Sequence, residues 1–236
     1  MTNQYFLSLK PYFLSFFSIK LTRINDEFHS NPTKGALNGT CVVVKNHNTR
    51  HLSEAKGVLL LIRNPYDAIL AEFNRIQGKS SKSEGSKHTA SANHAVFNTT
   101  KWFDRSRQLG KRWVDLHEKY IKFATNQNVP MYIFFYEDLK TNATQEMSKV
   151  LEFLDKNFHF YPTDAERRLR CLKKLEEINA SFKRKKVPFG WEIFPKDQIK
   201  MIDNFITKTR SSYVKNGFPD FPDYYRNSTN SDHKIL

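Results

Sequence analysis

Short apolar runs alternate with amphipathic stretches along most of this chain. Residues 41–45, 57–62 and 131–136 consist mainly of aliphatic or aromatic side chains, and polar residues bound each run. Short apolar runs that lack a polar alternation are typical of strands buried on both faces of a parallel sheet. The pattern therefore predicts three buried strands, with the first two next to each other in the sheet.

Helical periodicity fills the segments that follow these runs. Pro65 suits the first position of a helix, and Asp67 places a negative charge in its first turn. Asn142 and Gln145 have the spacing of a capping box at the start of another helix. Strands that alternate with helices predict an α/β fold with a parallel sheet. The predicted helices span about residues 65–75, 102–126, 142–156, 165–175 and 195–215.

The composition fits one domain with a substantial core and a strongly basic surface. The chain has 236 residues, of which 39% are hydrophobic and 14% aromatic, and its formal net charge is +14. A charge of this size favours an anionic partner, although a solvated basic surface would give the same count. No aromatic RNA-binding motif, zinc-finger spacing or basic-zipper pattern occurs, so we expect no nucleic-acid partner.

The cysteines and the glycosylation motifs bear on the compartment. Cys41 and Cys171 lack CxxC spacing, so the sequence predicts no metal site. Cys41 is either a core thiol in the first strand or the partner of Cys171, and such a bond requires an oxidising compartment. Five Asn-x-Ser/Thr motifs favour a lumenal protein, and they begin at Asn38, Asn98, Asn142, Asn179 and Asn227.

Basic side chains follow the first two predicted strands. Lys45 and His47 lie two positions apart where the first strand ends, and Arg63 follows the second. Ligands of open α/β sheets bind just outside the carboxyl ends of the strands, so these groups would share one crevice. A histidine there can act as a general base, and an arginine at a helix N-terminus suits phosphate or sulfate. The alternatives are a surface histidine and an arginine paired with a surface carboxylate.

Acidic side chains follow the third predicted strand. Glu137 and Asp138 stand directly after it and before the helix predicted from about residue 142. Carboxylates in this place can bind hydroxyl groups of an acceptor molecule, or they can cap the next helix. Capping is the interpretation that the spacing favours.

The order of these motifs resembles the sulfotransferase family. The shared elements are a strand followed by Lys-x-His, then a strand followed by Arg-x-Pro and a helix, then a late Phe-Lys-Arg-x-Lys stretch. The resemblance implies a P-loop-NTPase-like sheet and the co-substrate 3′-phosphoadenosine 5′-phosphosulfate (PAPS). It also implies residue roles: His47 as the base with Lys45 beside it, and a 3′-phosphate site made by Arg63, Lys183, Arg184 and Lys185.

Longer strings resemble one branch of that family. LLLIRNPYDAILAEFNR at 59–75, YEDLK at 136–140, RLRCL at 168–172 and SFKR at 181–184 are similar to the sulfotransferase domain of WSC-domain-containing proteins. The resemblance covers about residues 25–225. It implies sulfate transfer to glycans, including sialic acid, and therefore an anionic nucleotide and a glycan acceptor as partners. It further implies the Golgi lumen and a membrane anchor in the full-length form.

Two departures from the family pattern shape the remaining expectations. The Gly/Ser-rich loop that holds the 5′-phosphosulfate has no counterpart, since residues 1–24 contain no glycine. Ala71 stands where the broader family has a serine that binds the 3′-phosphate. The WSC-type branch also tends to have alanine at this position. We therefore expect an N-terminally truncated domain that lacks the first strand and that loop, with weak or no turnover.

These expectations divide the chain into an irregular apolar segment at 1–24, a partial sulfotransferase domain at 25–225 and a disordered tail at 226–236. The uninterrupted apolar part of the N-terminal segment, residues 11–19, is too short for a membrane span of about 20 residues. The segment is either a poor signal anchor or an irregular gene start. One alternative function is a catalytically inactive glycan- or polyanion-binding protein derived from the same fold. A kinase or NTPase is disfavoured because no Walker A motif is present.

Overall fold

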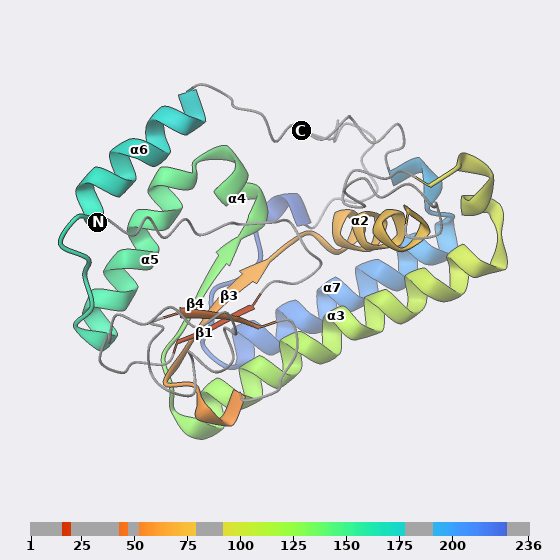
Figure 1. Ribbon diagram of the computed structural model, residues 1–236. Helices are drawn as coiled ribbons and strands as arrows, with labels where there is room; N and C mark the ends of the chain where they lie inside the picture. Colours follow the sequence, from red (N-terminus) through yellow and green to blue (C-terminus); the bar gives the residue numbers. More distant parts are fainter. Residues whose placement is uncertain (1–15, 20–42, 47–51, 79–91, 178–190, 226–236) are drawn as a thin grey trace.

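The computed structural model describes residues 16–19, 43–46, 52–78, 92–177 and 191–225 (Figure 1). Among them a four-stranded sheet has helices on both faces, which confirms the α/β class. The strands are β1 (Phe16–Ile19), β2 (Val43–Asn46), β3 (Gly57–Ile62) and β4 (Met131–Phe135). The helices are α2 (Pro65–Gly78), α3 (Thr100–Gln127), α4 (Tyr136–Thr141), α5 (Ala143–Phe158), α6 (Ala165–Glu177) and α7 (Lys196–Lys215). Short 3₁₀ turns are η1 (Leu52–Glu54), η2 (His94–Asn98), η3 (Trp191–Ile193) and η4 (Asp223–Tyr225).

The sheet differs from the predicted one in its strand order. The order is β2-β1-β3-β4, so β1 lies between the two strands that were expected to be neighbours. β1 pairs antiparallel with β2 and with β3, and among the described strands only the pairing of β3 with β4 is parallel. The prediction of an irregular segment over 1–24 is therefore wrong for Phe16–Ile19. Four apolar or small residues suffice for a short strand.

The carboxyl ends of β2 and β3 still lie at the same edge of the sheet, although β1 lies between the two strands. Phe16 of β1 pairs with Asn46 on one side and with Leu60 on the other. Because β2 and β3 both run against β1, their carboxyl ends lie at the same edge of the sheet. They stand two strand spacings apart, which is about 10 Å.

The helices match the predicted ones closely, with one exception. All five predicted helices form, and Asn142 caps α5 by accepting a hydrogen bond from the backbone N–H of Gln145 at 3.1 Å. The exception is α4, which begins at Tyr136 and ends the third strand one residue earlier than expected. The motif YEDLK at 136–140 is therefore helical.

The core has two parts because alternate residues of β3 face opposite ways. Val58, Leu60 and Ile62 pack into the larger cluster with α2, α3 and α7, while Leu59 and Leu61 pack into the smaller one with α4 and α5. In Figure 1, α3 and α7 lie side by side on one side of the sheet, with α5 and α6 on the other. Trp102 and Trp113 are fully buried in the larger cluster.

Candidate functional site

Arg63 lies where β3 ends and α2 begins. The next residue, Asn64, starts the helix: its side-chain Oδ1 accepts from the N–H of Tyr66 at 3.1 Å, and its carbonyl accepts from the N–H of Ala68 at 2.9 Å. Proline at the first helical position has no N–H to satisfy and already has the helical φ. The 14-residue helix therefore presents its N-terminus at the carboxyl edge of the sheet.

The guanidinium of Arg63 is held in place but has unused hydrogen-bond donors. Its Cζ lies 4.8 Å from the centroid of the Tyr136 ring, a cation–π contact. Its Nε and Nη1 are buried, and neither has a hydrogen-bond partner among the residues that the structure describes. Each buried, unpaired donor costs about 1–3 kcal/mol. An oxyanion would satisfy both donors with charge-assisted hydrogen bonds.

A half-buried carboxylate, Glu137, supports this corner of the sheet. Glu137 Oε1 accepts from the backbone N–H of Asn64 at 2.9 Å, and Oε2 accepts from the hydroxyl of Tyr225 at 2.8 Å. Burial raises the pKa of Glu137, whereas these two hydrogen bonds and the charge of Arg63 act in the opposite direction. Burial beside Glu137 also raises the pKa of Tyr225, so that its hydroxyl remains a donor.

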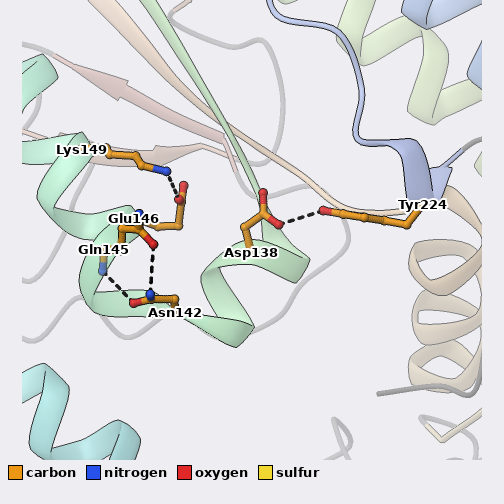
Figure 2. A network of polar contacts seen from close by, with 6 residues as sticks. All are labelled: Asp138, Asn142, Gln145, Glu146, Lys149 and Tyr224. Atoms are coloured by element: carbon orange, nitrogen blue, oxygen red, sulfur yellow. Dashed lines mark hydrogen bonds and ion pairs between the residues drawn. The ribbon is translucent and has the colours of Figure 1, made fainter.

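The neighbouring carboxylate has a different partner. Figure 2 shows Asp138 pointing away from α5 toward Tyr224, whose hydroxyl donates to Asp138 Oδ1 at 3.1 Å. Glu137 and Asp138 lie in the first turn of α4, whose cap residue, Phe135, makes no side-chain cap hydrogen bond. The favoured interpretation, that this acidic pair caps the next helix, is therefore wrong, because Asn142 caps α5 and the two carboxylates accept from Tyr224 and Tyr225.

Aromatic residues cover the first turn of α2. Trp191 in η3 stacks on Tyr66 with ring centroids 4.9 Å apart, and its Nε1 donates to Asp67 Oδ1 at 3.0 Å. The hydroxyl of Tyr66 donates to Asp203 Oδ1 at 2.8 Å and so ties α2 to α7. Sequence reasoning missed these contacts. Trp191 follows the basic stretch Lys183–Lys185 by only six residues, which is the signal that could have found it.

The structure describes part of the predicted site. Arg63 is at the strand end where it was expected. Lys45 lies in β2, where its backbone position pairs with Phe17 of β1. His47, Lys183, Arg184 and Lys185 lie outside the described residues, so their roles stay predictions.

The remaining features concern metals, membranes and thiols. Within the described ranges, no group of three or more His, Cys, Asp or Glu side chains is arranged to hold a metal ion. None of the helices in those ranges has the length and apolarity that crossing a membrane requires. Cys171 is a free, exposed thiol on α6, and Cys41 lies outside the described residues.

Comparison with known proteins defines the class of this α/β domain. A family model for the sulfotransferase domain matches residues 36–213, so the chain belongs to the sulfotransferase family. Members of this family are enzymes that move a sulfuryl group from a nucleotide co-substrate to an acceptor. The match confirms the family predicted from the motifs, and no solved structure matches the chain.

Among curated proteins, the chain is related to WSCD proteins of flies. WSCD family member GA21586 of Drosophila pseudoobscura pseudoobscura is 29% identical over 150 residues, which are 59% of this chain and 40% of that protein. WSCD family member CG9164 of Drosophila melanogaster is 26% identical over 165 residues, which are 66% of this chain and 44% of that protein. The chain therefore spans less than half the length of these relatives.

Proposed function

We propose that this protein transfers a sulfuryl group from PAPS to a hydroxyl of a glycan, with sialic acid as the candidate acceptor sugar. The observation that carries the proposal is the guanidinium of Arg63. It has two buried donors without partners, and it stands at the N-terminus of α2 and at the carboxyl edge of the sheet. Such an arrangement suits a phosphate group more than any neutral ligand.

The described residues fit a nucleotide that carries a separate 3′-phosphate. Arg63 and the first turn of α2 would bind that phosphate, with Lys183, Arg184 and Lys185 beside them by family resemblance. The position of Trp191 supports this assignment, because its contact with Asp67 anchors the chain shortly after the basic stretch to the same helix turn.

The chemistry of transfer would fall to residues near the end of β2. PAPS supplies the activated sulfuryl group. His47 would take the proton from the attacking hydroxyl, a contribution of about 10²–10⁴ in rate. Lys45 would stabilise the negative charge on the leaving oxygen. Glu137 is a poor candidate for the base, because both of its oxygens already accept hydrogen bonds within the protein.

The proposed compartment is the Golgi lumen, with a membrane anchor in a longer form of the protein. Its support is the similarity to WSC-type proteins together with the five glycosylation motifs, two of which begin at described and exposed residues, Asn98 and Asn142.

A second candidate function is passive binding of polyanions. The net charge of +14 favours it, and so does helix α6, which exposes five basic side chains. These are Arg167, Arg168, Arg170, Lys173 and Lys174. Two of them, Arg167 and Arg168, pair with Asp164, so the helix is only partly available to a ligand.

Calorimetry separates the two functions. The enzyme function predicts one site for adenosine 3′,5′-bisphosphate with micromolar affinity, and Arg63→Ala should weaken this binding by at least about tenfold. The passive function predicts binding only to long sulfated polysaccharides, with an affinity that falls steeply as salt is added. Binding of the polysaccharide alone, with no response to the bisphosphate, would overturn the proposal.

A further inference from the structure

The YEDLK motif lies beside Arg63, but the proposed chemistry does not use it. We infer that Glu137 is a positioning residue for the nucleotide site, and that Tyr225 supports it from outside the matched domain region. This inference rests on the proposed function, because it concerns how the phosphate-binding arginine is held.

The peptide group between Arg63 and Asn64 is fixed from both sides. Its carbonyl oxygen, on Arg63, accepts from Nε1 of Trp113 at 3.3 Å. Its N–H, on Asn64, donates to Oε1 of Glu137 at 2.9 Å. The orientation of this peptide determines where the Arg63 side chain leaves the backbone and how α2 begins. Glu137 therefore controls the phosphate-binding group without touching the phosphate.

The residue before Glu137 acts on the same arginine from a second direction. The Tyr136 ring lies 4.8 Å from the guanidinium carbon of Arg63. Tyr136 and Glu137 are adjacent in the chain, so the first turn of α4 orients both the side chain of Arg63 and the peptide that follows it. This turn is a single rigid support, since it continues directly from the buried end of β4.

Tyr225 stabilises the carboxylate of Glu137, which holds the Asn64 N–H. Its hydroxyl donates to Glu137 Oε2 across 88 positions of sequence. Without that donor, one oxygen of the half-buried Glu137 carboxylate would lose its partner, which favours protonation or rotation of the side chain. Either change weakens the bond to the N–H of Asn64.

The segment that delivers Tyr225 lies beyond residue 213, where the family match ends. It leaves α7 through a turn at Gly217, whose φ of 76° suits glycine. Phe221 is buried and packs edge-on against Tyr213 and Phe135, at centroid distances of 5.1 and 6.2 Å. Arg210 and Asp220 form a bidentate ion pair across the turn. These contacts place the segment independently of the Tyr225 hydroxyl.

The chain offers a matched pair of variants. Tyr225→Phe removes the hydrogen bond to Glu137 and keeps the ring, while Tyr224→Phe removes the bond to Asp138 and leaves Glu137, the acceptor of the Asn64 N–H, with both of its hydrogen bonds. Glu137→Ala removes the whole support, and Glu137→Gln keeps an acceptor for Asn64 but removes the charge. Thermal unfolding of each variant shows whether it is folded.

Two readouts test the inference. The first is hydrogen exchange at the Asn64 amide in nucleotide-free protein, which should be about tenfold faster in Tyr225→Phe and faster still in Glu137→Ala, because its acceptor is weakened or lost. The second is the Kd for adenosine 3′,5′-bisphosphate, which should rise about three- to tenfold in Tyr225→Phe and at least about tenfold in Glu137→Ala. Tyr224→Phe should match the wild type in both readouts, and Glu137→Gln should retain most of the Asn64 protection.

The outcomes distinguish this inference from the proposed function. If the wild type binds the bisphosphate and Tyr225→Phe binds it equally well, the inference alone is overturned. If Tyr224→Phe loses as much affinity as Tyr225→Phe, the effect is general loosening of the tail, and the inference is again overturned. If the wild type does not bind the bisphosphate at all, the proposed function and the inference fall together.

Discussion

Replacing Arg63 by methionine should separate stability from nucleotide binding. The variant keeps most of the side-chain length and the apolar contact with Tyr136, but it removes the positive charge and every donor. An arginine that serves the fold and an arginine that serves a ligand respond differently to this change. The described contacts of Arg63 indicate the second kind.

The structure sets the expected magnitudes. Two buried donors without partners cost about 1–3 kcal/mol each, and their removal returns that free energy to the nucleotide-free protein. The lost cation–π contact is worth about 0.5–2 kcal/mol, and the favourable charge of Arg63 on Glu137 is lost as well. The free energy of unfolding of Arg63→Met should therefore be unchanged or higher than that of the wild type.

Thermal unfolding with and without adenosine 3′,5′-bisphosphate measures both effects. At a concentration about 100 times the Kd, the nucleotide stabilises the wild type by about 2.7 kcal/mol, a rise in Tm of about 5–11 °C for a chain of this size. A tenfold weaker affinity would halve that rise in Arg63→Met, and a greater loss would remove it. A variant that unfolds several degrees earlier than the wild type yet keeps the full nucleotide-induced rise would refute the reasoning.

Three further predictions concern other parts of the chain. His47→Ala should lower the rate of sulfuryl transfer by about 10²–10⁴ while the Kd for the nucleotide stays close to that of the wild type, and equal losses in both would refute its role as a base. Burial lowers the pKa of His117 to about 3, so the unfolded state binds a proton that the folded state does not between about pH 6.5 and 3. The free energy of unfolding should fall by about 1.4 kcal/mol for each unit by which the pH is lowered across that window. His117→Gln should flatten this pH dependence, and the exposed control His159→Asn should leave it unchanged. In a secretory host, mass spectrometry should find glycan on Asn98, which is exposed at the end of η2, and little on Asn142, because the Asn142 amide makes two hydrogen bonds with Gln145.

The regular elements could be predicted because their signals are local. The continuous apolar runs predict β3 and β4, and Pro65 together with Asp67 predicts where α2 begins. β1 could not be predicted in the same way. Its four residues lie in an aromatic segment without flanking turn signals, and its place between β2 and β3 depends on pairing with residues far along the chain.

Of the described residues at the candidate site, the sequence predicted Arg63 but not the residues that hold it. Arg63 stands out because an arginine directly after a buried strand has few structural uses. The support around it could not be predicted, because Asn64 and Glu137 are 73 residues apart and Glu137 and Tyr225 are 88 apart. A carboxylate that follows a strand can equally cap a helix, and only the fold shows that its oxygens hold a distant backbone N–H and a distant hydroxyl.

The central claim is that the Arg63 guanidinium binds the 3′-phosphate of the nucleotide. Calorimetry of the wild type and Arg63→Ala with two ligands, adenosine 3′,5′-bisphosphate and adenosine 5′-monophosphate, tests it most directly. One charge-assisted hydrogen bond is worth about 1.5–3 kcal/mol, so the wild type should prefer the bisphosphate by at least about tenfold. Arg63→Ala should bind the two ligands with nearly equal affinity. A preference of the same size in both proteins would contradict the claim.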